Sequence, residues 1–437
     1  MKRFEKFGVS IGAVSLLLGV TTGCGNNDSS AAGKTTTISW LVRGTPAEQV
    51  WEHKVIQYFE KEHPNIRVQL IVIPQSEIDQ KLQTMFAAGD PPDVFAPNWV
   101  NAGFRTYQQD LLDLTPFLKK DPKLLAGFNS KAVSTYTVNG HVLAIPMNQL
   151  GSFLFYNKDM FKNAGLSDPP TSWNDKSWTW AKMVEDAKKL TTGSEGNKQY
   201  GLLDSFDPNG DAWLWGGDFF TKQTYQTGVV QPALNNPLNK KSMQAHYDLV
   251  YQSKVSPSAS ESNALSALGD PFLTSKVAME LTGGWGLWTY QPATFHWGVA
   301  ALPYTDPGER DFLYTDCMGI AKKSKHQQAA WELLQTIVNP KTGLKWYTEI
   351  TNATPPQKDL LQAWYQRISK QTGIPVKQLQ QLQEGAVAHG DESPNHVVAH
   401  YNAILNVLSQ AGNSVYSNTM SIDKAFAQIK SGLKPFE

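Results

Sequence analysis

The sequence predicts an α/β fold that contains a parallel sheet. Its first part alternates β-rich runs, at 37–42, 66–73 and 93–96, with two amphipathic helical segments. Strands that alternate with helices in this way pair in parallel, and the helices cover the sheet. With 437 residues, of which 41% are hydrophobic, the chain is long and apolar enough for two or three domains with sizeable cores.

Helix signals follow in order along the chain. The first helical segment begins at a capping box, in which Thr45 and Glu48 have the required spacing and Pro46 takes the first helical position. Apolar residues then repeat with a helical period through 51–59, and again in a second segment at 76–89. Later parts of the chain show the same signals, with strands expected at 152–156, 276–282 and 297–302 and helices at 178–190 and 324–338.

Composition excludes several classes of function. The 39 basic and 39 acidic residues balance, which removes the electrostatic reason to expect nucleic acid or an anionic membrane surface as a partner. The 14 Trp, 15 Tyr and 19 Phe residues argue against extended disorder. Two cysteines cannot form a disulfide framework.

The N-terminal segment predicts export. A basic start is followed by an uncharged stretch over 7–24, which is marginal for the ~20 residues of a membrane helix and is typical of a signal peptide. The sequence Thr-Thr-Gly before Cys24 resembles a bacterial lipoprotein cleavage box, although Thr21 stands where an aliphatic residue is commonest. We therefore expect a signal peptide at 1–23, a lipid on Cys24 and a flexible tether at 24–35. The alternative is an ordinary signal peptide cut nearby, with Cys24 incidental.

A series of short motifs then resembles one family. The segment 88–95, with the sequence AGDPPDVF, resembles the signature of bacterial extracellular solute-binding proteins of family 1, the maltose-binding-protein-like proteins that serve ATP-driven importers. Further stretches match the family in the same order, at 111–116, 156–159, 169–173, 276–279, 284–285, 297–303 and 318–321. The resemblance covers roughly residues 36–350.

The resemblance implies a two-lobed, periplasmic-binding-protein-like α/β fold with a ligand cleft and a hinge between the lobes. The first lobe would comprise 36–147 and 304–339, and the second 148–303 and 340–437. The implied function is that of a substrate-binding lipoprotein of an ABC importer, which binds a sugar, most simply an oligosaccharide, and delivers it to a membrane permease. We expect a monomer on the outer face of the bacterial cytoplasmic membrane, with no enzymatic activity, cofactor or metal.

Sugar binding needs aromatic faces for C–H groups and paired polar groups for hydroxyls. Trp285 is the strongest candidate, because it follows a Gly-Gly pair at a strand end and Gly284 permits close approach of a ligand. Trp99 and Asn98 follow another strand, where ligands of α/β sheets bind. Gln149 lies at the first crossover between the implied lobes.

Four further residues are weaker candidates for the ligand site. Trp213 and Trp215 would share one side of an extended strand, whereas on a helix they would diverge and one would enter the core. Arg43 follows the first strand and offers a planar donor group, and Asp316 precedes a later strand. For each of them, packing or a solvated turn is the alternative.

Four other interpretations stay open. Residues 207–218 place oxygen ligands like a calcium loop, although Ala212 replaces the expected Gly, and His389, His396 and His400 could hold a transition metal. A secreted glycoside hydrolase with a Trp-lined cleft would need paired carboxylates, for which Glu280 with Asp204, Asp207 or Asp211 are the candidates. A surface adhesin with the same fold is also compatible with the sequence, as are polyols, glycerophosphodiesters and uronic-acid oligomers as ligands.

Overall fold

The computed structural model describes residues 35–101, 103–194, 197–306 and 310–437. The predicted signal peptide at 1–23 and the lipidation site Cys24 lie outside the described residues, as does the tether up to residue 34. Among the described residues, no helix combines the length and the apolar character needed to cross a membrane.

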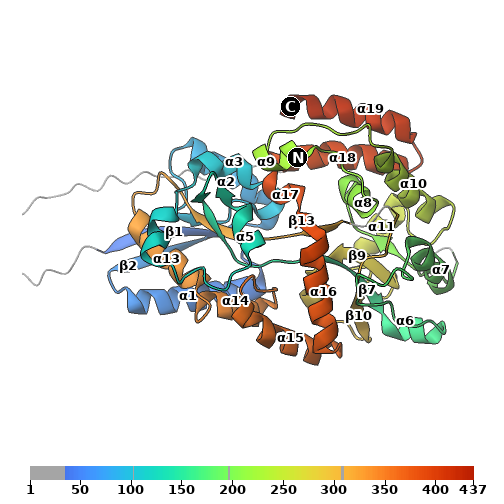
Figure 1. Cartoon of the computed structure of the whole chain (residues 1–437), viewed down its shortest axis with the longest axis horizontal. Helices are drawn as coiled ribbons and strands as arrows, with labels where there is room; N and C mark the ends of the chain where they lie inside the picture. Colours follow the sequence, from blue (N-terminus) through green and yellow to red (C-terminus); the bar gives the residue numbers. More distant parts are fainter. Residues whose placement is uncertain (1–34, 102, 195–196, 307–309) are drawn as a thin grey trace, which may run out of the picture. The chain divides into compact units, whose positions relative to one another are not determined.

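The structure alternates strands and helices in the first part of the chain and is mostly helical after residue 320 (Figure 1). The strands are β1 (Thr36–Val42), β2 (Ile66–Val72), β3 (Val94–Phe95), β4 (Thr137–Val138), β5 (His141–Val142), β6 (Ala144–Pro146), β7 (Ser152–Asn157), β8 (Leu203–Asp204), β9 (Met279–Gly283), β10 (Trp297–Ala300), β11 (Asp311–Leu313), β12 (Cys317–Ile320) and β13 (Gly390–Glu392). The α-helices are α1 (Pro46–Glu62), α2 (Ile78–Ala87), α3 (Phe104–Tyr107), α4 (Thr115–Lys120), α5 (Ser130–Thr135), α6 (Lys158–Asn163), α7 (Trp180–Leu190), α8 (Pro208–Leu214), α9 (Lys222–Thr227), α10 (Pro237–Tyr251), α11 (Ala259–Ser266), α12 (Gly286–Thr289), α13 (Gln327–Val338), α14 (Gly343–Thr351), α15 (Lys358–Thr372), α16 (Val376–His389), α17 (Pro394–Val397), α18 (Tyr401–Tyr416) and α19 (Ile422–Leu433). Short 3₁₀ helices are η1 (Gln75–Glu77), η2 (Trp99–Asn101), η3 (Gln108–Asp110) and η4 (Lys434–Phe436).

The first sheet has the order β2-β1-β3-β12-β6. β1 pairs in parallel with both β2 and β3, so the predicted parallel arrangement of the first three strands is confirmed. β12 is antiparallel to β3 and to β6, because the chain returns from a second sheet before it adds this strand. The start of β12 therefore lies at the same edge as the ends of β1 and β3.

The second sheet has the order β10-β7-β9-β8 and is largely antiparallel. β8 and β9 form its parallel pair. The alternation of strands and helices thus predicted the parallel pairing among β1, β2 and β3 but not the antiparallel pairing of the second sheet.

Helix α1 begins as the sequence predicts. The Thr45 side chain accepts a hydrogen bond from the Glu48 backbone N–H, and the Glu48 carboxylate accepts one from the Thr45 backbone N–H. Trp51 and Phe59 are buried on its apolar face, whereas Tyr58 is 38% exposed. The capping box fixes Glu48 at the end of β1, where it contacts the candidate site described below.

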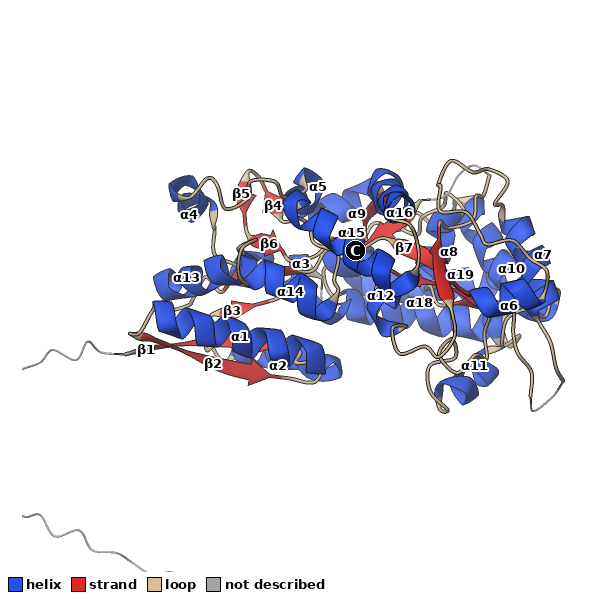
Figure 2. Ribbon diagram, turned by 90° about the horizontal axis from the view of Figure 1, so that it is seen from below, coloured by secondary structure: helices blue, strands red, loops and turns tan. Residues whose placement is uncertain are grey.

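Separate apolar clusters underlie the two sheets. One cluster combines buried residues of 38–147 and 317–353, a second combines those of 153–302 and 364–386, and a third lies under α18 and α19. Figure 2 shows α1 and α14 side by side, and the Trp51 indole N–H donates to the Gly343 carbonyl at 2.8 Å. The sequence assigns 340–437 to the second lobe, but α14 packs in the first cluster because Leu344 and Tyr347 are buried there.

Chain segments between the sheets are tied together where they cross. β11 lies on the path from β10 to β12 and pairs in parallel with β13 of the C-terminal segment. The Asp311 carboxylate is fully buried and accepts the Ser152 backbone N–H at 3.1 and 3.2 Å. This bond joins β11 to the first residue of β7, so the outgoing and returning connections are held together.

Candidate functional site

The edge of the first sheet brings together three predicted residues. Arg43 follows β1, Trp99 begins η2 just beyond β3, and Asp316 precedes β12. The Arg43 guanidinium carbon lies 4.8 Å from the centre of the Trp99 ring, and its Nη2 lies 3.6 Å from Asp316 Oδ2. Because β1, β3 and β12 are neighbours in the sheet, the strand order brings these three side chains together.

Arg43 is held in place by Glu48. Its Nε lies 2.9 and 3.0 Å from the two carboxylate oxygens, and its Nη2 lies 2.7 Å from Oε1. Burial lowers the pKa of Arg43, but the charges of Glu48 and Asp316 raise it by more, so the net shift is upward. The guanidinium is therefore a fixed cation in this arrangement, with one face on an aromatic ring.

Asp316 is oriented by the first crossover. Asn148 Nδ2 donates to Asp316 Oδ2 at 2.8 Å, and the Asp316 backbone N–H donates to Asn148 Oδ1 at 2.9 Å. These reciprocal bonds fix a half-buried carboxylate between Arg43 and the C-terminal segment.

Contacts continue from this edge toward the second sheet. His396 Nε2 lies 3.9 Å from Asp316 Oδ1, and the His396 ring is 5.7 Å from that of Tyr314. Tyr314 in turn meets Trp285 with ring centres 4.9 Å apart. A continuous series of contacts thus runs from the end of β3 to the end of β9; we call it the interlobe strip, and its members are Trp99, Arg43, Asp316, His396, Tyr314 and Trp285.

Two glycines place Trp285 at its end of the strip. A Cβ on Gly283 would lie 2.0 Å from the Trp285 ring, so only glycine lets the indole occupy this position. The Gly284 N–H donates to the Gly151 carbonyl at 2.7 Å, and a Cβ on Gly284 would come within 2.9 Å of the same oxygen. The Gly-Gly pair therefore anchors the turn to the crossover and leaves Trp285 half-buried.

Several buried polar atoms beside the strip lack partners among the described residues. They are Trp99 Nε1, Thr315 Oγ1 and Glu392 Oε2. The other oxygen of Glu392 is used, since it lies 2.7 Å from His396 Nδ1 and accepts the Thr315 backbone N–H at 2.8 Å. Unpaired buried donors and acceptors are costly, and a ligand rich in hydroxyl groups would pair with both kinds.

Other predicted residues occupy different positions. Asn98 is fully buried, and its amide bonds to the Tyr136 hydroxyl, the Thr315 carbonyl and the Cys317 N–H. It therefore joins β3 to β12 beneath the strip and has no amide group left for a ligand in this arrangement.

Gln149 lies in the first crossover, between Asn148, which bonds to Asp316, and Leu150, which pairs with Tyr314. Its backbone carbonyl accepts from Gln383 at 3.0 Å, while its side-chain nitrogen is buried without a partner among the described residues. It lines a pocket of about 300 Å³ together with Pro356, Tyr365 and Val387.

Of the two alternatives for Trp213 and Trp215, an extended strand or a helix, the structure shows the helix. Trp213 lies in helix α8, and Trp215 caps the end of this helix, so their side chains diverge. Trp213 is fully buried and stacks on Phe312, with ring centres 4.3 Å apart. Trp215 is half-buried against Trp180, at 5.4 Å.

Sequence reasoning did not place Tyr314, Glu392 and His396 in the ligand site. The sequence suggests His396 only as a metal ligand together with His389 and His400, yet His389 stacks on Trp173 and His400 is exposed. The spacing of four residues between Glu392 and His396 is a signal in the sequence that could have indicated their contact, which the structure shows.

The carboxylates proposed for a calcium loop and for a glycoside hydrolase already have partners in the structure. Asp207 caps helix α8, while Asp218 accepts bonds from Arg310 and Tyr225, so the carboxylates of 207–218 serve separate partners. Glu280 is buried in β9, where burial raises the pKa of its carboxyl to about 7. Its two oxygens accept from Ser205 and Tyr290, each at 2.8 Å.

The protein is built as two lobes, one around each sheet, and the strip lies between them. This is the architecture of a binding protein, and the comparisons with known proteins agree with it. The family model of bacterial extracellular solute-binding proteins matches residues 44–343, and this chain belongs to that family. The predicted fold class and family are therefore confirmed. The chain is a substrate-binding protein, and the glycoside hydrolase alternative is wrong.

Individual relatives are similar over most of their length. The galactooligosaccharide-binding protein of Bacillus subtilis is 26% identical over 366 residues, covering 80% of this chain and 79% of the relative. The maltodextrin-binding protein MdxE of the same organism is 27% identical over 362 residues, covering 80% of each chain.

Solved structures share the fold. An ABC substrate-binding protein of Listeria monocytogenes, in complex with cycloalternan, aligns with a TM-score of 0.78 at 23% identity, covering 92% of this chain and 98% of that one. Maltose-bound MalE3 of T. maritima aligns with a TM-score of 0.73 at 22% identity, covering 92% of this chain and all of that one.

Proposed function

We propose that this chain binds an oligosaccharide along the interlobe strip and delivers it to the permease of an ABC importer. The observation that carries the proposal is the strip itself, which joins charged, amide-held groups of the first lobe to the aromatic pair Tyr314 and Trp285. The names of similar proteins, which bind galactooligosaccharides and maltodextrins, support the ligand class.

The chemistry of the strip suits a sugar. Pyranose rings present C–H faces that pack on aromatic rings, and the half-buried Trp285 offers such a ring at one end of the strip. Trp99 at the other end is only 4% exposed and has the Arg43 guanidinium over its ring, so it supports Arg43 rather than offering a free face. The hydroxyl groups would pair with Asp316, with His396 and with the unpartnered oxygen of Glu392.

Ligand binding would favour the closed arrangement of the lobes. The moving bodies we propose are 36–147 with 304–339, to which α14 is added on account of its packing, and the remaining residues from 148 onward. A ligand that contacts both bodies shifts the equilibrium only by its better affinity for the closed form. The chain would act as a monomer without cofactor and would make or break no covalent bond in its ligand.

The proposal is tested by thermal unfolding of the purified full-length chain with a panel of mono- and oligosaccharides. A bound sugar raises the unfolding temperature in proportion to the logarithm of its concentration, with a larger effect for oligosaccharides. Chromatography of the recovered sugar separates binding from turnover, since shortened products would contradict a pure binding role. If no sugar changed the unfolding temperature, sugars would be excluded as the ligand class.

The membrane attachment is proposed separately. We propose that residues 1–23 are removed on export and that Cys24 carries the lipid that holds the protein at the outer face of the cytoplasmic membrane. Mass spectrometry of the protein purified from a bacterial host should give an N-terminal Cys24 peptide with a diacylglyceryl group. The Cys24→Ser variant should appear in the medium or periplasm instead of the membrane fraction. An unmodified Cys24 in the membrane-associated protein would contradict this assignment.

A further inference from the structure

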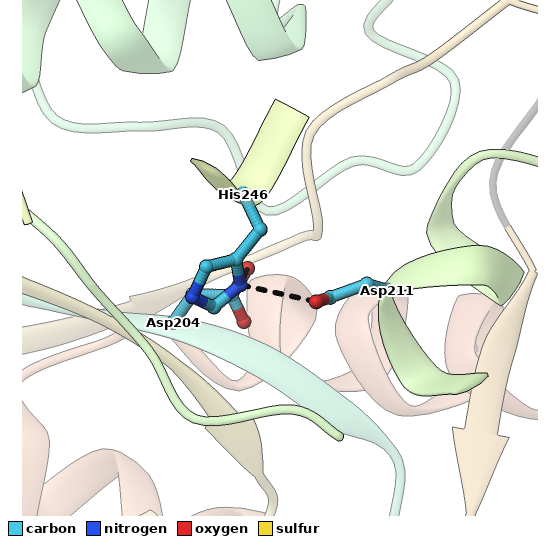
Figure 3. Close-up of side chains that lie close together, drawn as sticks. All are labelled: Asp204, Asp211 and His246. Atoms are coloured by element: carbon cyan, nitrogen blue, oxygen red, sulfur yellow. Dashed lines mark hydrogen bonds and ion pairs between the residues drawn. The ribbon is translucent and has the colours of Figure 1, made fainter. Parts of the chain in front are cut away.

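A second polar cluster lies inside the other lobe, on three elements that the strip does not use. Asp204 ends β8, Asp211 lies in helix α8 and His246 lies in helix α10 (Figure 3). His246 Nδ1 lies 3.0 Å from Asp211 Oδ2 and 3.5 Å from Asp204 Oδ2. One ligand atom from each residue falls within 4.8 Å of the other two.

Both carboxylates are buried and incompletely paired. The side chains of Asp204 and Asp211 are 1% and 3% exposed, and that of His246 is 13% exposed. Asp204 Oδ2, which faces the imidazole, has no hydrogen-bond partner among the described residues, and neither has Asp211 Oδ1. Buried carboxylate oxygens are normally hydrogen-bonded or coordinated to a metal, so these two point to a missing partner.

The spacing of the ligand atoms suits a small divalent ion. With metal–ligand bonds of about 2.0–2.2 Å, neighbouring ligands of one ion lie about 3.0–3.5 Å apart. Both distances measured from His246 Nδ1 fall in this range. We propose that Asp204, Asp211 and His246 bind a divalent transition-metal ion, for which Zn²⁺ is the natural probe.

The residue types narrow the choice of ion. One imidazole nitrogen with two carboxylate oxygens is a typical ligand set for Zn²⁺ and is shared by Mn²⁺, whereas Ca²⁺ and Mg²⁺ prefer oxygen alone. Two ionised carboxylates and a neutral imidazole sum to −2, a charge that a bound divalent ion would balance.

The surroundings leave room for the remaining ligands. A pocket of about 210 Å³ is lined by Asp204 and His246 together with Asp207, Ser262 and Asn413. Water molecules in it can complete the coordination of an ion. Tyr416 stacks on His246 with ring centres 3.9 Å apart and donates its hydroxyl to Asp211 at 3.1 Å, which fixes the imidazole and one carboxylate.

The ion would stabilise the second lobe by linking several of its elements. It would link the end of β8 to α8 and α10, and Tyr416 connects the same group to α18. Helix α8 also carries Trp213, which packs on Phe312 of β11 beside the strip. The expected role is therefore structural: the ion stabilises the lobe that presents Trp285, without contacting the sugar.

The direct test is metal binding by the full-length chain after chelator treatment. Isothermal titration with Zn²⁺ should give one ion per chain, and the unfolding temperature should rise with the logarithm of free Zn²⁺. Co²⁺ should give the visible absorption of a low-symmetry site with one nitrogen ligand. Ca²⁺ at the same concentration should leave both signals unchanged.

Variants locate the ion. Asp211→Asn and His246→Gln should each weaken Zn²⁺ binding at least tenfold and abolish the Co²⁺ absorption. Asp159→Asn is the matched control, because Asp159 contacts His296 at 3.1 Å on the surface and, among the described residues, His296 has an ion pair with this one carboxylate. This variant should bind Zn²⁺ like the wild type. Should a variant fail to fold, the titration of the wild-type chain still decides.

Two results would overturn the proposal. One is the lack of Zn²⁺ and Mn²⁺ binding by the folded wild-type chain, which would make the cluster an ion-paired group that holds α10 against α8. The other is stoichiometric binding that survives in both variants, which would place the ion elsewhere.

Discussion

The turn after β9 and helix α8 each carry a tryptophan that the sequence put forward for ligand binding, and the structure treats the two differently. Trp285 follows two glycines, stays half-buried and meets Tyr314 in the strip. Trp213 lies within a helical turn, is fully buried between Phe312 and Arg310, and has the Arg310 guanidinium carbon 3.5 Å above its ring.

The difference comes from the backbone that carries each ring. A strand that ends in Gly-Gly leaves the next side chain at the sheet edge, with no Cβ beneath it. A helix has one face toward the core, and a large aromatic residue on that face is buried whatever its neighbours in sequence. Trp285 is therefore available to a ligand, while Trp213 supports the segment that leads to the strip.

The largest effect is expected for Trp213→Ala. Removing a fully buried indole should lower the free energy of unfolding by about 3–5 kcal/mol. Sugar affinity of the folded fraction should change less than threefold. Chemical denaturation and titration of the same preparation measure both. A large loss of affinity with unchanged stability would mean that Trp213, like Trp285, belongs to the ligand site.

The next largest effect, on the pH dependence of stability, is expected for Glu280 in strand β9. Burial raises the pKa of its carboxyl from 4.5 to about 7 in the folded protein. The unfolded chain ionises this group first, so the stability of the wild type falls as pH rises from about 4.5 to about 7 and is level above that.

Glu280→Gln imitates the protonated carboxyl and should remove this fall. Above pH 7 the variant should be more stable than the wild type by up to about 3 kcal/mol, and near pH 4.5 the two should converge. Urea unfolding of both proteins from pH 4.5 to 8 measures the difference. A gap that is constant with pH would show that Glu280 is ionised throughout.

Trp285→Ala should weaken oligosaccharide binding by about 2 kcal/mol, or roughly 30-fold, because the ring would lose its stacking area at the end of the strip. Unfolding should change little in the absence of sugar, since the ring is half-buried. Trp346→Ala is the matched control, because Trp346 is also half-buried but packs against Tyr58 on another face. Equal losses of affinity in both variants would remove the special role of Trp285.

The smallest effect is expected at the polar end of the strip. Asp316→Asn keeps the side-chain shape that Asn148 holds but removes the charge facing Arg43 and His396. Affinity should fall by about 1–1.5 kcal/mol, which is fivefold to tenfold. Calorimetric titration with the sugar found by thermal unfolding measures it. An unchanged affinity would confine binding to the aromatic end.

Local patterns predicted local features well. The Thr45–Glu48 capping box, the parallel pairing of β1 with its neighbours and the Gly-Gly turn before Trp285 all depend on residues close in sequence. The meeting of Arg43 with Trp99 followed from the rule that ligands gather at the carboxyl ends of strands. The sequence left the segment around Trp213 open, because a spacing of two fits either one side of a strand or two diverging positions on a helix, and the structure forms the helix.

What the sequence determined by itself is the family, the order of the first strands and helices, and the position of Trp285, since each depends on contiguous motifs. Tertiary structure decided which distant groups meet: it carried His396 and Glu392 from the C-terminal segment to Asp316, and it brought His246 to Asp204 and Asp211. The physical reason is that these contacts join residues 35 to 80 positions apart, which meet only when the sheets and the crossings between them have formed. Local sequence patterns do not predict these contacts, because the free energy that forms them comes from burying whole faces of helices and sheets.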